Sequence, residues 1–505
     1  MTIRTYQPRV SVTLLKNIAR TTLGANVATS GRYRGAHRQT DLTRFLGHGG
    51  SVVTRKSIRH SAGQWSVTLT DQSVTEQLES LYGLIEPMDV VEIRMAHDVS
   101  PYYATLPKHM PILMRGFVSH VSHKRAMSGR GPVRSVTISG QDYGRLLEMI
   151  NIVYLPGMVV GQNLTDAYHL FLTYGLNTKS DQTAGTFISG VMTSVVAPFI
   201  ANMRSAVANG VGGANGGAGA QSPVLDFGVE LDVQGGSISP FGSQEWKGGT
   251  VDALLRHYAD VGPWNELYVE DREGGPFLVY RATPFKDLTG AFIQQIPNLP
   301  TVVKIPDCDV VDEELSRSDD GIANYYWVDA PRYNMVDGAL LKAAVAGSLS
   351  PPPFVSGYAN CASQFYGVRA MQLETQQGPR VDGQDKSQLD AGNVQGLDLV
   401  NQRRDVLIKN NRDNVVLESG RMTLRGNETI KAGVYLQRLL GDGRSQAPKA
   451  EYYVTEVRQD FKPFGKYETT VEVERGTGFV VRAQQGGGVN SPYLSDLNLG
   501  GVYGT

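Results

Sequence analysis

The sequence predicts an α+β fold that is mainly β, in which two similar antiparallel β-barrels flank an inserted mixed and helical region. Two observations predict this fold: strand-like alternation of apolar and polar residues near both ends of the chain, and a hairpin pattern that occurs twice. The chain has 505 residues, of which 41% are hydrophobic. At about 150 residues per domain, this length allows roughly three domains.

The first barrel is predicted over residues 46–145. Within it, residues 64–70 alternate between apolar and polar types, which is typical of a half-buried strand. Similar strand-like runs occupy residues 90–95, 112–121 and 133–139. The last two runs are joined by a polar connection, so we expect antiparallel pairing.

The middle region, residues 146–400, changes to helical periodicity. Apolar residues recur three and four positions apart at 146–150, 163–172 and 251–258, and each segment is predicted to be a helix. A Gly-rich segment at 209–222 offers few side chains to bury. We therefore expect a mobile loop there.

The rest of the chain returns to strand character. Residues 267–270 and 277–280 flank a Gly-containing turn and predict a hairpin. Residues 401–482 are predicted to complete the second barrel, and the tail 483–505 is expected to be flexible when the chain is alone. The candidate anchors of this tail for a partner are Tyr493, Leu494 and Leu497.

The most informative feature is an internal repeat. Residues 117–121, FVSHV, resemble residues 453–457, YVTEV, and each segment is followed at a similar distance by a matching strand, at 136–140 and 471–476. Two β-hairpins can look this much alike by chance, and the alternative is a duplicated barrel. A chain with two barrels imitates a dimer of a one-barrel protein, so three chains would supply six barrels and match a sixfold ring.

Charge is balanced overall and uneven locally. The net charge of −1 excludes a general polyanion binder, but the N-terminal arm, residues 1–45, is basic. This arm is expected to dock on an acidic segment of an adjacent chain, and phosphates of a nucleic acid are the open alternative. The candidate docking residues are Arg32, Arg34 and Arg38 on the arm and Asp309, Asp312 and Glu313 on the acidic segment.

Motifs of enzymes and metal sites are absent from the sequence. It contains no GxSxG nucleophile elbow, HExxH zinc helix or GxxxxGK[ST] phosphate loop. His120 and His123 are three apart in a predicted strand and would point to opposite faces. No catalytic, cofactor-binding or metal-binding residue is predicted, and no cofactor. The two cysteines, Cys308 and Cys361, are expected to be free.

No targeting or membrane segment is predicted. The N-terminus lacks the apolar core of a signal peptide, and no run reaches the 18 apolar residues needed to span a bilayer. The nearest candidate, residues 187–200, is short and contains polar residues and a proline. A soluble protein made in the cytoplasm is expected.

Several stretches resemble the baseplate hub proteins of contractile-tailed bacteriophages. Four are similar to the first tube-like barrel of that family: QWSV at 64–67, DVVEI at 89–93, RGFV at 115–118 and SGQDY at 139–143. Three resemble the end of the second tube-like barrel: IKAG at 430–433, YVTEV at 453–457 and ERG at 474–476. The resemblance covers most of residues 40–482.

The resemblance implies a structural virion protein and no enzymatic activity. By it, the chain forms a homotrimer that adapts the sixfold tail tube to the threefold central spike. The protein would be made in the host cytoplasm and lie in the tail baseplate of the virion. The implied partners are the tail tube protein, the central spike protein, other baseplate proteins and, as an open possibility, the tape-measure protein; a membrane is not among them. The alternative function is a baseplate-associated enzyme that degrades cell walls or glycans through β-rich binding domains.

Overall fold

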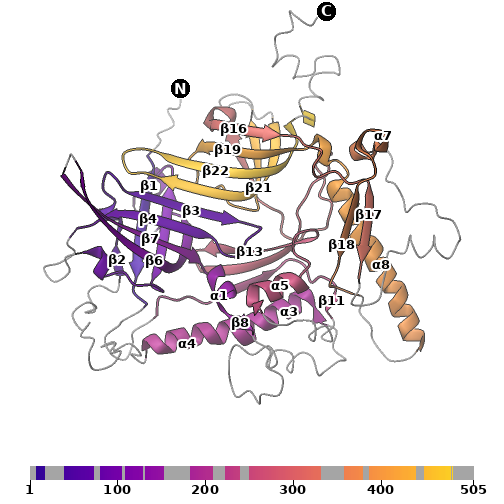
Figure 1. The fold of residues 1–505 in the computed structure, drawn as a ribbon, viewed down its shortest axis with the longest axis horizontal. Helices are drawn as coiled ribbons and strands as arrows, with labels where there is room; N and C mark the ends of the chain where they lie inside the picture. Colours follow the sequence, from indigo (N-terminus) through magenta and orange to yellow (C-terminus); the bar gives the residue numbers. More distant parts are fainter. Residues whose placement is uncertain are drawn as a thin grey trace, which may run out of the picture.

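Strands dominate the architecture of the chain. The computed structural model confirms the α+β, mainly β class, with one large sheet and a group of helices along one side (Figure 1). The residues that the structure describes are 7–17, 39–72, 80–104, 109–128, 131–152, 182–208, 222–238, 249–330, 358–378, 386–439, 448–478 and 480–481.

The large sheet has 13 strands and draws on both ends of the chain. Its N-terminal members are β1 (Arg9–Leu15), β2 (Gln39–Asp41), β3 (Ser51–Ser57), β4 (Gln64–Thr70), β5 (Val90–Ala96), β6 (Ile112–Ser128) and β7 (Gly131–Asp142). Its C-terminal members are β15 (Val302–Pro306), β16 (Val310–Ser316), β19 (Glu418–Arg425), β20 (Tyr435–Leu439), β21 (Pro448–Phe461) and β22 (Tyr467–Gly476).

The two groups of strands follow the same order of neighbours. In the first strand set the order is β3-β4-β7-β6-β5-β1, and in the second strand set it is β16-β19-β22-β21-β20-β15. One difference lies at the end of each set, because β1 is antiparallel to β5 whereas β15 is parallel to β20. The hairpins that the sequence repeat matched, β6–β7 and β21–β22, occupy equivalent places.

A β-bulge recurs at the same position of both sets. The register of β6 against β7 shifts between Val118 and His120, and that of β21 against β22 shifts between Val454 and Glu456. Ser119 and Thr455 are therefore the equivalent bulged residues. Bulges are specific features of a backbone, so their coincidence is better explained by duplication than by chance.

The turn into the preceding strand also recurs. Met88 and Gly433 both have positive φ, 73° and 82°. The Met88 amide donates to the carbonyl of Val118 and the Gly433 amide to that of Val454, each over 2.8 Å. Met is an unusual residue in this left-handed region, and it holds the place that Gly holds in the second set.

The structure corrects the alignment of the repeated strands. Val121 faces Ile138 in the first set, and Val457 faces Val471 in the second. The residue equivalent to Val471 is thus Ile138, two positions from Val136, where the sequence comparison placed it. The β6–β7 hairpin is longer than the β21–β22 hairpin between these pairs, and this difference causes the shift.

Alternation along the strands produces the hydrophobic cores. In β4, Trp65, Val67 and Leu69 are buried and the residues between them are half-buried. They join a cluster under the first set, and a separate cluster lies under the second. Members of the second cluster are Ile305, Met422, Leu424, Leu436, Tyr452, Val454, Val471 and Val473.

The middle region supplies a second layer. Its main elements are α1 (Gly144–Met149), α3 (Ala184–Val191), a π-helical turn (Met192–Val196), α4 (Ala197–Ala208), α5 (Val251–Tyr258), and a sheet of β10 (Gly228–Leu231), β14 (Gly275–Ala282) and β13 (Asn265–Arg272). Short pairs join β8 (Asn151–Ile152) to β12 (Gly249–Thr250) and β9 (Gln182–Thr183) to β11 (Ser237–Ile238). The last layer consists of β17 (Tyr325–Asp329), β18 (Ala370–Glu374), α7 (Ser363–Tyr366) and α8 (Lys386–Asn411).

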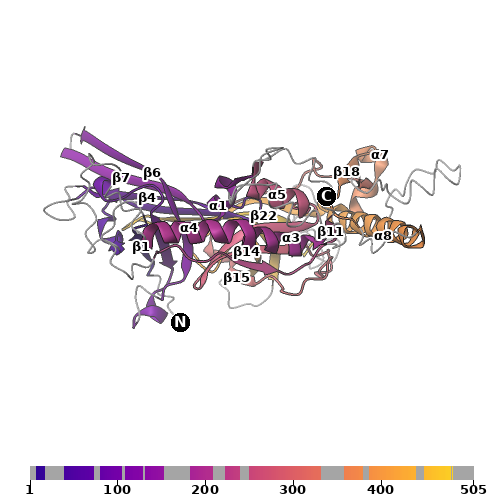
Figure 2. The same ribbon diagram turned by 90° about the horizontal axis from the view of Figure 1, so that it is seen from below.

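The layers spread along one long axis. Figure 2 shows the β6–β7 hairpin projecting at one end of the molecule and α8 at the other. The helical stretch Ala184–Arg204 is, among the described residues, long and apolar enough to cross a membrane by length and composition. Half of this stretch is buried, and its residues Phe187, Ile188 and Val191 lie in a cluster with α1, α5 and β14.

Several predicted elements can be compared with the structure. The helices at 146–150 and 251–258 are confirmed as α1 and α5, and the hairpin is confirmed as β13–β14. Thr250 caps α5 by accepting from the Ala253 amide over 3.2 Å. The helix at 163–172 lies outside the described residues, as do positions 209–221 of the Gly-rich loop and the tail 483–505.

Two of the predicted boundaries need correction. Residues 9–15, inside the predicted arm, form β1 and pair with β5 because their apolar residues alternate and are buried. Strands β15 and β16, inside the predicted middle region, belong to the second strand set. Strand β16 was not predicted because it is an acidic and mostly exposed edge strand, which lacks the apolar alternation of the other strands.

We predict that Gly420→Ala detaches β16 from the sheet. A Cβ at this position would lie 2.0 Å from the Glu314 carbonyl oxygen, and φ is 155°. The free energy of unfolding should fall by more than about 1 kcal/mol, and the amides of β16 should exchange faster with deuterium while those of β3 do not change. Gly49→Ala, where a Cβ meets nothing within 4 Å, is the control. Unchanged exchange in β16 would contradict the close packing.

Candidate functional site

The first and second strand sets meet along one pair of strands, which we call the joint. Strand β21 pairs antiparallel with β3, from Glu456 opposite Ser57 to Phe461 opposite Val52. Before its bulge, the same edge of β21 pairs with β20. The bulge at Thr455 is therefore the point where β21 changes neighbour, and its carbonyl accepts the Ile58 amide over 3.0 Å.

Opposite charges cross the joint on its exposed face. Arg55 of β3 binds Glu456 of β21 through both guanidinium arms, with 2.8 Å from Nη2 to Oε2. Arg59 Nη2 lies 2.9 Å from Glu474 Oε2. Both arginines are more than half exposed, so each pair contributes little to stability and mainly fixes the register.

Buried charges hold the joint from below. Lys56 Nζ of β3 lies 2.9 Å from Asp142 Oδ2 of β7 and 2.7 Å from Asp271 Oδ2 of β13. Burial alone would lower the pKa of Lys56, but the two carboxylates outweigh it and raise that pKa. Burial raises the pKa of Asp142 to about 6, against the opposing effect of Lys56. This cluster binds the β13–β14 hairpin to the first strand set.

A second buried cluster binds the same hairpin to the second strand set. Arg281 Nε of β14 donates to Glu266 Oε2 over 2.9 Å, and its Nη2 donates to Tyr453 Oη of β21 over 3.0 Å. Tyr453 Oη in turn donates to Glu266 Oε1 over 2.6 Å. All three side chains are buried, so removing one partner would leave an uncompensated charge at high energetic cost.

The turn of the hairpin makes a third attachment. Glu273 Oε2 accepts from Arg94 Nη2 of β5 over 2.8 Å, and Asp271 Oδ2 accepts the Arg115 amide of β6 over 3.2 Å. The β13–β14 hairpin thus lies across both sets and is bound to each. The joint is braced by buried polar contacts and is not a simple meeting of two sheet edges.

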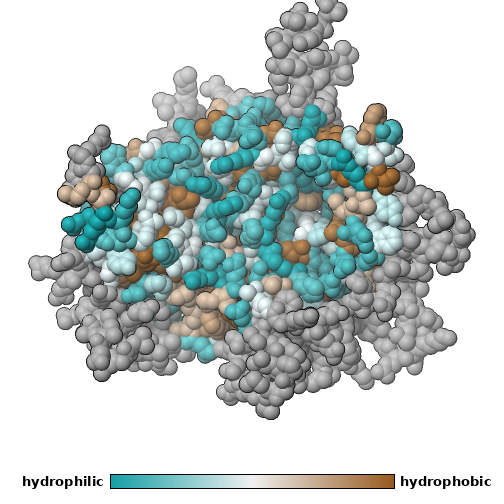
Figure 3. Space-filling view, in the orientation of Figure 1, coloured by the Kyte–Doolittle hydropathy of each residue, from teal (hydrophilic) through white to brown (hydrophobic). Residues whose placement is uncertain are grey.

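The exposed face near the joint is polar and hollowed. A groove of about 620 Å³ is lined by Val53, Arg55, Gln64, Trp65, Ser66, Ser119, Ser139, Gly140, Gln141 and Arg458. Most of these are polar residues that alternate with the buried ones along β3, β4, β7 and β21. Figure 3 shows hydrophilic residues spread over the face of the molecule that lies in view. The sheet therefore presents a polar, exposed surface that runs over both strand sets.

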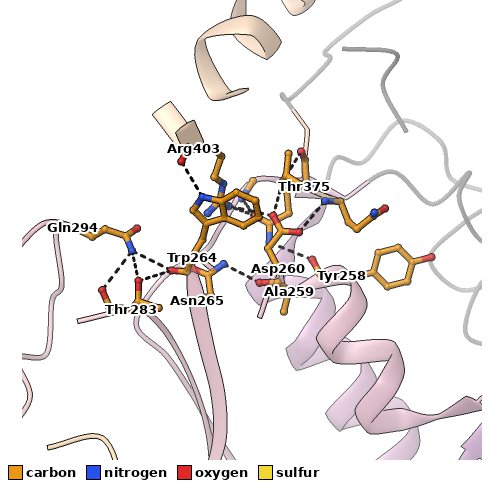
Figure 4. A network of polar contacts seen from close by, with 12 residues as sticks. Tyr258, Ala259, Asp260, Trp264, Asn265, Thr283, Gln294, Thr375 and Arg403 are labelled. Carbon is orange, nitrogen blue, oxygen red and sulfur yellow. Dashed lines mark hydrogen bonds and ion pairs between the residues drawn. The ribbon is translucent and has the colours of Figure 1, made fainter. Parts of the chain in front are cut away.

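A further polar network attaches the layer of α8, β17 and β18 (Figure 4). Asp260 Oδ1 accepts the Gln376 amide over 2.8 Å, and its Oδ2 lies 3.7 Å from Arg403 Nη2 of α8. Burial raises the pKa of Asp260. Trp264 Nε1 donates to the Arg403 carbonyl over 2.9 Å, so α8 is tied to the start of the same β13–β14 hairpin.

The predicted acidic docking residues lie at the outer edge of the second strand set. Asp309 ends a short 3₁₀ turn, and Asp312 and Glu313 are exposed in β16. Glu313 is bound by the chain's own Arg438, and Asp309 lies 4.0 Å from Arg425. The acidic segment is thus partly neutralised within the chain, and is not wholly available to a basic arm.

The remaining predicted docking residues lie outside the described residues: Arg32, Arg34 and Arg38 on the arm, and Tyr493, Leu494 and Leu497 on the tail. Sequence reasoning missed the Lys56 cluster. The signal was present, because Lys56 falls on the inward face of β3 with Val52 and Thr54, and a lysine there needs a buried partner.

No cluster of metal ligands is assembled in the part of the chain that the structure describes. No group of three or more His, Cys, Asp or Glu residues in that part could hold a metal ion. His123 Nε2 lies 3.0 Å from Asp71 Oδ2, and its ring stacks on Tyr82. Cys308 and Cys361 are free, as predicted.

Comparisons with known proteins found solved structures only. No family model and no curated protein matches the sequence. The tail protein from Neisseria meningitidis MC58 matches with a TM-score of 0.42 and 10% identity, over 93% of this chain and 97% of that one. The 43 kDa tail protein of prophage MuSo2 from Shewanella oneidensis matches with 0.42 and 12%, over 92% and 98%.

The chain is similar to tail proteins. A third match is an E. coli component of the type VI secretion system, described as similar in structure to bacteriophage T4 tail proteins, with a TM-score of 0.31, 9% identity, and 85% and 74% coverage. All three TM-scores lie below 0.5, so they leave the function to be argued from the chain's own geometry.

We predict a pH dependence of stability that depends on Asp142. Its folded-state pKa of about 6 is above the ordinary value of 3.8, so between these pH values the folded protein holds a proton that the unfolded chain has lost. This contribution is complete below pH 3.8 and is lost as pH rises through about 6, up to about 3 kcal/mol. Asp142→Asn removes it.

The measurement is reversible denaturant unfolding of both proteins from pH 4 to pH 7. The stability of Asp142→Asn relative to the original protein should increase over this range. The variant keeps the oxygen that accepts the Gly144 amide, so it should still fold. A constant difference between the two proteins would contradict the raised pKa.

Proposed function

We propose that the chain is the baseplate hub of a contractile tail: a homotrimer that adapts the sixfold tail tube to the threefold central spike. The observation that carries this proposal is the repeated strand order, with both strand sets fused edge to edge at the joint in one chain. A fused pair of equivalent units is what an adaptor between sixfold and threefold symmetry requires.

The duplication is imperfect in a way that suits an adaptor. Three chains would present six similar strand sets, which a sixfold neighbour can contact equivalently. The helical middle region and the layer of α8 occur once per chain, and β1 and β15 differ in direction. These unique parts would repeat three times around the ring, which matches a threefold partner.

The polar face of the sheet supports a ring with a wetted inner wall. The groove residues at the joint come from strands of both sets, and the charges there are paired or surrounded by Ser and Gln. In a closed ring of such sheets this face would be continuous. We therefore place the hydrated channel on the polar face and the covering helices on the apolar side.

The proposed partners are other copies of this chain, the tail tube protein, the central spike protein and other baseplate proteins, in the virion. A structural role without catalysis is supported by the acidic segment. Its Asp307 and Glu313 both bind Arg438, and Asp307 also lies 2.9 Å from Lys449. Carboxylates held in this way stabilise the second strand set.

We predict a trimeric mass for the purified chain, alone or with its tube and spike proteins. Native mass spectrometry should give three copies of this 54.9 kDa chain per complex, because three pairs of strand sets complete a sixfold ring. A stable monomer in the presence of both neighbours would contradict the proposal. So would a cell-wall clearing activity that one carboxylate substitution abolishes, since that outcome favours an enzyme.

A further inference from the structure

Two of the strand edges that remain unpaired among the described residues are those of β6 and β16. Beyond its bulge, β6 pairs only with β7, from His120 opposite Ser139 to Ser128 opposite Gly131. At the end of the large sheet, β16 pairs only with β19. Open edges of this kind are sites at which another chain can add a strand.

The internal duplication assigns these two edges to each other. In the strand order, β6 is equivalent to β21, and β16 is equivalent to β3. At the joint, β21 pairs with β3. The edges they use are equivalent to the edges that β6 and β16 leave open. Within one chain β16 ends the sheet at the second set, whereas β6 lies in the first (Figure 1), so the missing pair needs two copies of the chain.

The register of the missing pair follows from the pairs already present. Val52 faces Val67, which faces Ile138 in the first set; Glu313 faces Met422, which faces Val471 in the second. Because Ile138 and Val471 are equivalent, Glu313 is the counterpart of Val52. One residue further along, Glu314 is the counterpart of Val53.

The partner residues on β6 follow in the same way. At the joint Val52 faces Phe461 and Val53 faces Asp460. Counting from the equivalent bulges at Ser119 and Thr455, the counterparts of Phe461 and Asp460 are Arg125 and Lys124. The transferred register therefore sets Glu313 opposite Arg125 and Glu314 opposite Lys124.

We propose that β16 of one copy adds to the open edge of β6 of the next copy, antiparallel and in this register. The contact is head to tail and repeats around the ring, so it closes the sheet between chains as the joint does within a chain. The number of chains in the ring rests on the proposed function; the strand pairing does not.

Charge and exposure both favour this occupant. The β16 edge carries Asp312, Glu313 and Glu314, all exposed, and the β6 edge carries exposed Lys124 and Arg125. No part of the register was chosen by charge, yet it places two acidic residues directly opposite two basic ones. Such cross-strand pairs stabilise a sheet, and like charges in that position oppose pairing.

The same charges oppose incorrect pairing. Two β16 edges would bring acidic residues together, and two β6 edges would bring basic ones together, so neither edge favours its own kind. Glu313 also binds Arg438 within the chain, which leaves the Glu314 and Lys124 pair as the cleaner one to alter.

Charge exchange at this pair tests the proposal. Glu314→Lys and Lys124→Glu, each alone, should lower self-association at least tenfold at low salt, measured by sedimentation velocity. The double variant, with the charges exchanged, should recover most of it, which a merely damaged surface would not do. Lys462→Glu, on an exposed turn, is the matched control and should associate normally. Failure of the double variant to recover association overturns the pairing.

Cysteine cross-linking tests the register. In a chain with Cys308→Ser and Cys361→Ser, the pair Glu314→Cys with Lys124→Cys should form an intermolecular disulfide on mild oxidation. The pair Glu314→Cys with Arg125→Cys is the matched control, since adjacent residues on a strand point to opposite faces. Equal cross-linking of both pairs, or of neither, overturns the register.

The cross-linked products separate this inference from the proposed function. A ladder that ends at three chains supports both. A ladder that ends at another number keeps the strand pairing and overturns the trimeric hub. A trimer by native mass without the Glu314 to Lys124 cross-link keeps the hub and overturns the strand pairing.

Discussion

The pairing of β21 with β3 is the interaction on which the rest of the molecule depends. It turns two equivalent sets of strands into one continuous sheet and fixes how far the second is rotated from the first. Backbone hydrogen bonds provide the connection. The bulge at Thr455 makes it possible, because the same edge of β21 pairs with β20 before the bulge and with β3 after it. A strand without a bulge would have to continue beside its first neighbour.

Buried charges make this connection specific. The β13–β14 hairpin lies under both sets and binds each through a cluster, one around Lys56 and one around Arg281. Buried ion pairs add little net stability compared with apolar packing, but they penalise any arrangement that separates the partners. The hairpin thereby selects one geometry of the joint, and α8 is tied to the same hairpin through Trp264.

Sequence reasoning reached the fold class and the repeat because alternation in strands such as β4 is a direct consequence of one buried face. It placed the repeated hairpins at equivalent positions but misaligned Ile138, because the two hairpins differ in length and the pattern of residue types does not show where each strand turns. It also missed β16 as a member of the second set. An edge strand is specified by the backbone of the strand beside it, which the pattern of residue types does not show. The role of the acidic segment as a contact region stays a prediction. Its internal partner Arg438 lies far along the chain, so the sequence pattern did not show it.

The most direct test of the account is hydrogen–deuterium exchange of β6 beyond its bulge. If the two strand sets are equivalent and the ring closes through them, those amides of residues 120–125 that point away from β7 should exchange quickly in the monomer and become protected in the assembled ring. Their final protection should match that of residues 456–461, which are already paired with β3 in a single chain. If those open-edge amides stay unprotected in the assembled ring, the account is contradicted.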